Sequence, residues 1–153
     1  MASAVTALAT AYAERSVEQR RAAIAERASG IVPQGGHSYA HVSEYITVVK
    51  IVGELSTYNT PPLRQLLVDL IYHGRIFLVL DMTEVDFSDS TGQGVLVGAL
   101  KRVRAHDGRL ALVVPHDRLA KVFRITGLTK VFPIFDTVDR AVEFLGRELG
   151  GHG

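Results

Sequence analysis

Residues 86–95 read DFSDSTGQGV and hold the side chains of this sequence that are best placed to do chemistry. The hydroxyls of Ser90 and Thr91 lie between the acid Asp89 and two glycines, downstream of the apolar run RIFLVL. A hydroxyl beside an acid can act as a nucleophile, cap a helix or accept a phosphate, and glycines between a strand and a helix can cradle one. Four kinds of chemistry are therefore open.

A nucleophilic serine needs a base within hydrogen-bond reach and usually an oxyanion donor. The G-x-S-x-G turn that exposes such a serine in many hydrolases is absent. All six histidines are expected in loops or at the ends of elements, so none is an obvious base; they are His37, His41, His73, His106, His116 and His152. The sequence therefore disfavours an enzyme.

The sequence also gives little support for a nucleotide or metal site. The glycines fit neither G-x-x-x-x-G-K-[ST] nor G-x-G-x-x-G, and the next lysine after Gly94 is Lys101. An acidic run of the kind that hard cations prefer is present at Asp81, Glu84, Asp86 and Asp89. Solvated loop acids near a helix start account for this run better. We expect neither a cofactor nor a metal.

Helix capping and modification remain. Asp, Ser and Thr are favoured at the N-cap because their oxygens accept from the unpaired N–H groups of the first turn, so Asp89, Ser90 or Thr91 can serve. A hydroxyl at an exposed helix start beside small residues is also accessible to a kinase. Capping and phosphorylation can share the site, and both stay open.

Composition indicates one globular unit. The chain has 153 residues, of which 47% are hydrophobic and 22% charged, enough to bury a core. A net charge of +1 is not the one-sided field of a nucleic-acid or membrane-surface binder. The absence of cysteine excludes disulfides and thiolate chemistry. No apolar run reaches the roughly 18 residues of a membrane span, and no secretory signal is recognised. We expect a cytoplasmic protein without direct nucleic-acid or membrane partners.

The elements that must position the motif alternate along the chain. Gly30–Ser38, GIVPQGGHS, separates an Ala/Arg/Glu-rich segment, expected to be helical, from the rest. Within residues 44–55, EYITVVKIVGEL, a strand that ends at Gly53 is expected to lead the domain. A helix with Thr60 as N-cap and Gly74 as its stop is expected to follow. Further strands are expected at 75–82, 109–115 and 131–135, and further helices at 94–108, 116–128 and 137–149. This alternation predicts helices packed on a mostly parallel sheet.

The stretch VDFSDSTGQGVL resembles the signature of the STAS domain family, the anti-sigma factor antagonists, in which a strand runs into D-S-[ST]-G-x-G-[VL] and then a helix. GEL at residues 53–55, LVLDMTEVDF, DGRLALVV and LAKVFRITGLTKVFPIF fit the same family. The resemblance implies an α/β STAS-type fold, a mixed, mostly parallel sheet of four to five strands with about four helices. It divides the chain into an N-terminal helical extension with linker (1–40), a STAS domain (41–149) and a tail (150–153).

The resemblance also implies a function. The serine after the motif aspartate is the phosphoacceptor of this family, which makes Ser90 the expected site and Thr91 a second candidate. Such proteins bind an anti-sigma factor that is also a serine kinase and so free the sigma factor in a stress-response partner switch. Phosphorylation ends the binding, and a serine phosphatase restores it. The implied partner-binding residues are Glu54, Ser56, Asp89, Ser90, Thr91, Gly92, Gln93 and Gly94.

Three residues depart from the family pattern. Ser56 follows GEL where many relatives carry Asp, Gln93 replaces an apolar residue between the glycines, and Thr91 is a second hydroxyl. The runner-up function is a STAS scaffold or sensor subunit of a larger signalling assembly. In that case residues 1–40 would supply the interface, either with a partner or with a second copy of the chain. The alternative is that residues 1–40 form an inert extension.

Overall fold

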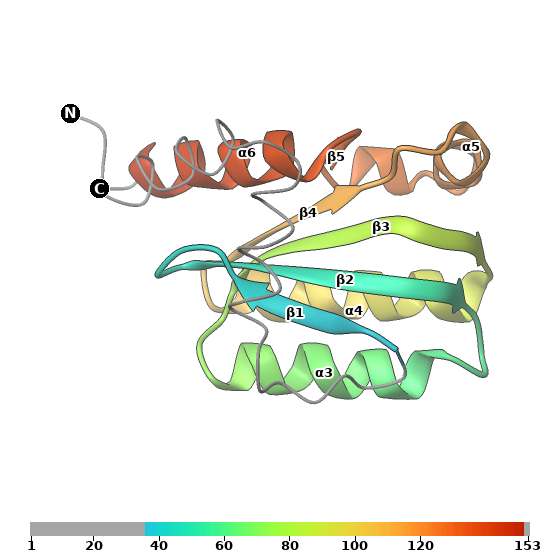
Figure 1. Cartoon of the computed structure of the whole chain (residues 1–153), viewed down its shortest axis with the longest axis horizontal. Helices are drawn as coiled ribbons and strands as arrows, with labels where there is room; N and C mark the ends of the chain where they lie inside the picture. Colours follow the sequence, from blue (N-terminus) through green and yellow to red (C-terminus); the bar gives the residue numbers. More distant parts are fainter. Residues whose placement is uncertain (1–35, 152–153) are drawn as a thin grey trace.

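A computed structural model of the chain describes residues 36–151 (Figure 1). Of the N-terminal helical extension and linker expected at residues 1–40, residues 1–35 therefore lie outside the described part. In the described part, one five-stranded sheet has its strands in sequence order, with β1 antiparallel to β2 and all later pairs parallel. The strands are β1 Ser38–His41, β2 Ile46–Leu55, β3 Phe77–Ser88, β4 Arg109–Val113 and β5 Ile134–Phe135. The expected mixed, mostly parallel sheet is confirmed.

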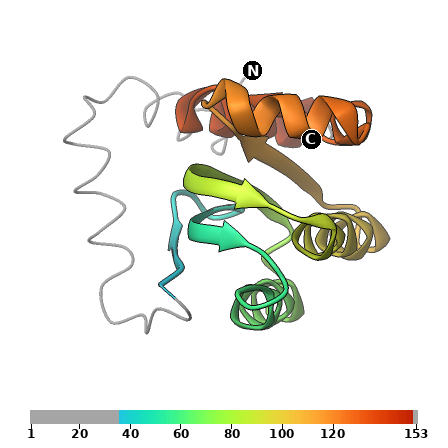
Figure 2. The ribbon, with the colours of Figure 1, turned by 90° about the vertical axis from the view of Figure 1, so that its right-hand side faces the viewer.

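Helices cover both faces of this sheet, as the end-on view shows (Figure 2). They are α3 Thr60–Tyr72, α4 Ser90–Ala105, α5 Asp117–Ile125 and α6 Val138–Gly151, with a short 3-10 helix, η1, at Leu128–Lys130. The larger core cluster joins α3, α4 and α5 to one face, and α6 packs on the other face. Among the described helices, none is long and apolar enough to cross a membrane.

The start of the domain differs from the expectation in two respects. The expectation that a strand at residues 44–55 leads the domain is wrong, because β1 precedes it and pairs with it from Ser38 to His41. That strand also does not end at Gly53. The positive φ of Gly53 (82°) permits an irregularity at which the register with β3 shifts, and β2 then continues to Leu55.

Thr60 is not the N-cap of α3. It is the first helical residue, and Asn59 occupies the cap without a side-chain hydrogen bond. The carbonyl of Ser56 accepts from the backbone N–H groups of both Asn59 and Thr60, so backbone groups close the turn that a capping side chain would otherwise stabilise. The stop at Gly74 is confirmed by its φ of 86°.

His37, directly before β1, gives a testable pH dependence. Its side chain is buried, Nδ1 accepts from the N–H of Val52, and Nε2 has no hydrogen-bond partner among residues 36–151. Burial, partly opposed by the nearby backbone of Asn59, lowers the pKa of His37 below its ordinary value of 6.5. The unfolded chain therefore binds more protons at this residue below about pH 6.5, and stability falls as the pH falls.

Urea denaturation at several pH values measures this effect. We expect the wild type to lose more stability between pH 7.5 and pH 5 than His37→Asn, whose amide oxygen can still accept from Val52 but does not titrate. Parallel pH profiles for the two proteins would show that His37 is not the group responsible.

Candidate functional site

Helix α4 begins at Ser90, and the residue that caps it is Asp89. Asp89 has an extended backbone, and its Oδ1 accepts from the N–H of Gly92 at 2.9 Å. Its carbonyl accepts from the N–H of Gln93 at 3.0 Å. Of the three residues that could have capped this helix, Asp89 does so, which leaves the Ser90 side chain without a capping role.

Asp89 also joins the helix start to the end of β2. Its N–H donates to the carbonyl of Leu55 at 3.0 Å, and its Oδ2 accepts from the N–H of Thr57 at 3.3 Å. The Thr57 hydroxyl donates to the Thr91 hydroxyl at 3.3 Å. We call residues 54–58 the β2 corner. The β2 corner and the 89–94 segment therefore form one continuous surface, although the chain separates Thr57 from Asp89 by 32 residues.

The closest approach within this surface is at Gly92. A Cβ built on this buried glycine would lie 2.0 Å from the carbonyl oxygen of Leu55 and 2.6 Å from the Leu55 carbonyl carbon. Real Cβ atoms do not come so close to backbone atoms. Glycine at residue 92 is therefore required for α4 to begin against the β2 corner.

The expected site residues differ in exposure. Ser90, Thr91, Gly94 and Glu54 are exposed, Asp89 and Gln93 are half-buried, and Gly92 and Ser56 are buried. Ser56 is only 5% exposed, and its Oγ has no hydrogen-bond partner in the described part of the chain. Its neighbours Thr57 and Tyr58 are exposed and form the outer surface of the β2 corner. Within residues 36–151, the Ser90 hydroxyl makes no hydrogen bond, in contrast to that of Thr91.

The acidic run is engaged in local contacts. Asp81 Oδ1 accepts from both the backbone and the hydroxyl of Thr83, and Glu84 lies 3.4 Å from the ammonium of Lys50. Within the described ranges, no group of three or more His, Cys, Asp or Glu side chains is arranged to hold a metal ion. The geometry of the site is that of an exposed hydroxyl on a rigid, capped helix start.

Comparison with known families fits this geometry. The model of the family described as STAS domain matches residues 39–141, which is more than half of the chain. This chain belongs to the STAS domain family. The resemblance seen in the motif is thereby confirmed.

Curated relatives of this STAS domain are regulatory proteins. The anti-sigma-B factor antagonist of Listeria monocytogenes is 39% identical over 84 residues, which cover 55% of this chain and 74% of the relative. The protein of the same description from Staphylococcus aureus is 36% identical over 80 residues, 52% of this chain and 74% of the relative. These relatives are named as antagonists of a regulatory factor, which agrees with the expectation that the chain is not an enzyme.

A solved structure gives the same fold. The anti-sigma factor antagonist SpoIIAA in its unphosphorylated form superposes with a TM-score of 0.57 at 23% identity, over 74% of this chain and 98% of that one. The expected STAS-type fold is thus confirmed.

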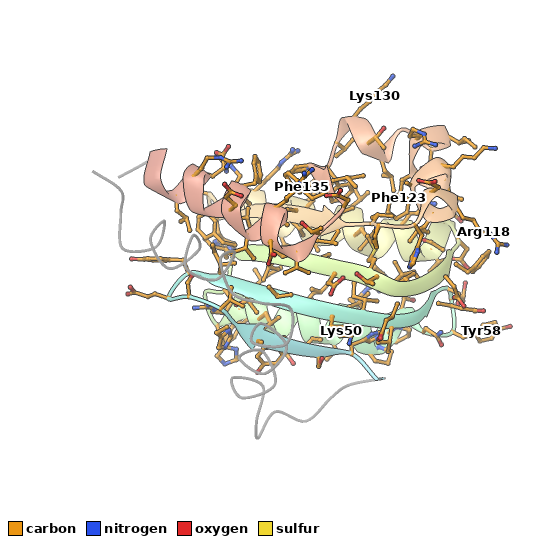
Figure 3. The ribbon with its side chains drawn as sticks, turned by 45° about the horizontal axis from the view of Figure 1, so that its top comes forward. Lys50, Tyr58, Arg118, Phe123, Lys130 and Phe135 are labelled. Atoms are coloured by element: carbon orange, nitrogen blue, oxygen red, sulfur yellow. The ribbon has the colours of Figure 1, made fainter. Side chains whose placement is uncertain are left out.

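Two exposed aromatic residues at the site, one in the motif and one in the β2 corner, were not among the expected site residues. Tyr58 is 90% exposed and Phe87 is 50% exposed, and Figure 3 shows Tyr58 projecting from the STAS domain. Strict alternation along β3 would bury Phe87 together with Val85, but the register shift opposite Gly53 and Glu54 breaks that alternation. Tyr58 follows GEL closely in the sequence, and that proximity was the available signal.

The cap of α4 can be tested by mutation. We expect Asp89→Ala to lower the free energy of unfolding of the STAS domain by about 1 kcal/mol, since it removes the acceptor of Gly92 N–H and the link to Thr57. Asp89→Asn should lose only part of this, because its amide oxygen still accepts. Urea denaturation measures both, and equal stability of Asp89→Ala and wild type would contradict the capping role.

Proposed function

We propose that this chain is an anti-sigma factor antagonist whose binding to an anti-sigma factor is switched off by phosphorylation of Ser90. The observation that carries the proposal is the exposed Ser90 hydroxyl, which makes no hydrogen bond within residues 36–151 and belongs to the first residue of a helix capped by its neighbour. The anti-sigma factor is a serine kinase in this scheme, and a serine phosphatase restores binding. The proposal places the chain in the cytoplasm, where sigma factors act.

The geometry favours Ser90 over Thr91 as the acceptor. The Thr91 hydroxyl is paired with that of Thr57 and would have to leave the β2 corner to be modified. Ser90 has no such contact within the described residues, and it is exposed. A kinase can therefore reach Ser90 without breaking the contact between α4 and β2.

A phosphate on Ser90 is compatible with the fold. It adds about 1.5 to 2 negative charges at neutral pH, and a helix N-terminus stabilises such a charge by about 0.3 to 1 kcal/mol. The nearby carboxylate of Asp89 opposes part of this stabilisation. Since neither Ser90 nor its neighbour Thr91 is buried, the modified chain keeps its core.

The same phosphate changes the docking surface. That surface joins the helix start, with Ser90 and Gln93, to the β2 corner, with Glu54 and Tyr58. Desolvating a dianion against a partner without matching cations costs several kcal/mol. Because about 1.4 kcal/mol is a tenfold change in affinity, this cost is enough for a switch.

The experiment has two steps. Full-length Ser90→Ala is used as bait, and the recovered anti-sigma factor is then incubated with ATP and wild-type protein before mass spectrometry. We expect one phosphate on Ser90 and loss of the complex. Phosphate on Thr91 alone, a complex that survives modification, or ATP turnover by the chain without partner would overturn the proposal.

A further inference from the structure

One face of helix α5 packs against the larger core cluster. Leu119 and Phe123 are 3% and 0% exposed and belong to the larger core cluster. At its start, the ring of His116 contacts the carbonyl oxygen of Thr83 in β3. The helix is thereby fixed against the sheet, and its opposite face is held in a defined orientation.

That opposite face is cationic and carries one exposed apolar residue, Ile125, at its C-terminal end. Arg118, Lys121 and Ile125 are spaced i, i+3 and i+7, with Arg124 beside them, and all four are exposed. Ile125 is 75% exposed. Lys130 in η1 adds a further exposed cation. We call these five residues the α5 surface.

Within α5 these cations are accompanied by one acidic residue, Asp117, in the first turn. Residues 90–131 contain eight basic and two acidic residues, an excess of six positive charges in a chain whose net charge is +1. Among residues 36–151, the four cations of the α5 surface form no ion pair, whereas Lys50, Arg109, Arg140 and Arg147 do. Unpaired cations around an exposed apolar residue resemble the apolar centre and polar rim of a protein interface.

The start of α5, with Arg118, also lies at the end of the sheet where α4 begins. β3 and β4 are parallel, so α4 and α5, which follow them, start at the same edge. Figure 3 shows Arg118 and Tyr58 projecting at this same end of the molecule. A partner that covers the start of α4 can therefore reach α5 as well.

We propose that the α5 surface is a second docking site for the anti-sigma factor, and that it binds an acidic segment carrying an apolar side chain that packs on Ile125. The inference rests on the proposed function for the identity of the partner. A protein fits better than a membrane, because the apolar face of α5 that could enter lipid is buried in the core. A protein also fits better than a nucleic acid, since the α5 surface carries no aromatic side chain on which bases could stack.

This site would contribute to the switch. Complementary charge speeds association and is weakened by salt. A phosphate on Ser90 adds about 1.5 to 2 negative charges to the same basic segment and offsets part of its attraction for an acidic partner. Phosphorylation therefore weakens the docking contact at Ser90 directly and also reduces the attraction of the α5 surface for an acidic partner.

The first test measures binding of the anti-sigma factor to unphosphorylated full-length chain by titration calorimetry at low and high salt. We expect the double variant Arg118→Glu, Lys121→Glu to bind at least about tenfold more weakly and to lose most of the salt dependence. The double variant Lys101→Glu, Arg104→Glu is the matched control, since it makes the same change of charge at two exposed helical residues with the same i, i+3 spacing, neither of which forms an ion pair within the described part of the chain. A loss for Arg118→Glu, Lys121→Glu no larger than that for this control would overturn the proposal.

The second test does not need the anti-sigma factor. NMR spectra of the full chain are recorded with a short synthetic peptide of glutamate and leucine, and with its counterpart in which lysine replaces glutamate. We expect shifts at Arg118, Lys121 and Ile125 with the acidic peptide only, and none in the double variant. Chemical-shift changes only at other residues, or no changes at all, would show that the α5 surface does not bind acidic segments. If the peptide binds there but no anti-sigma factor binds the chain, the proposed function is wrong, whereas the α5 surface does bind acidic segments.

Discussion

Gly92→Ala is expected to lower the free energy of unfolding by about 3 kcal/mol, at the upper end of the cost of overpacking. The new methyl group would lie 2.0 Å from a backbone oxygen of Leu55, which cannot move aside as the end of a flexible side chain can. Relief requires α4 to move away from the β2 corner. That movement would break the bonds from Asp89 to Leu55 and Thr57.

Gly94 provides the matched control two residues along the same helix. A Cβ at Gly94 meets nothing within 4 Å, and its φ is not positive. Gly94→Ala should therefore stabilise the protein by roughly 0.5 to 1 kcal/mol, because alanine loses less backbone entropy in a helix. Urea denaturation of both variants checks the pair; a Gly92→Ala protein as stable as Gly94→Ala would show that the contact with Leu55 is not required.

The second large effect concerns Ser90. Against the anti-sigma factor, Ser90→Ala should bind about as tightly as unmodified wild type, and Ser90→Asp about a hundredfold more weakly, or roughly 3 kcal/mol. The carboxylate places an unpaired charge in the docking surface, as the phosphate would. Phosphorylated wild type carries the larger charge and should bind more weakly still.

Stability measurements separate this effect from misfolding. An acid at the first position of α4 is compatible with the helix dipole, so both Ser90 variants should unfold within about 1 kcal/mol of wild type. Titration calorimetry gives the affinities. Equal affinities for Ser90→Ala and Ser90→Asp would show that charge at this residue does not control binding.

Local patterns were sufficient to predict most of the fold. The apolar runs that became β3 and β4, and the i, i+3, i+4 spacing of α3, reflect burial of one face or two and can be recognised in a single segment. β1 could not be recognised in this way. Its sequence SYAH is too short to indicate a strand on its own. It is a strand because it pairs with β2 and because Arg75 donates to the carbonyl of Ser43 in the turn between them and to that of Ile46 at the start of β2.

The candidate site was only partly predictable. The motif placed Asp89, Ser90 and Gly92 at a helix start, because strand, glycine and helix signals are adjacent in the sequence. The contact of Leu55 with Gly92 and the pairing of Thr57 with Thr91 depend on how β2 ends after its irregularity at Gly53, which no local pattern encodes. The exposure of Phe87 follows from the same irregularity and was unforeseen for the same reason.

The contact between Leu55 and Gly92 bears on how such a switch could be moved between proteins. Residues 86–95 are contiguous, and a designer would be inclined to graft them alone onto another scaffold. The start of their helix packs against the carbonyl of Leu55, which belongs to a different strand, and two of the five hydrogen bonds of Asp89 are made with Leu55 and Thr57. The transferable unit is therefore discontinuous: it comprises residues 53–59 together with 86–95, and a chimera that carries only the second segment should present its serine on a frayed helix.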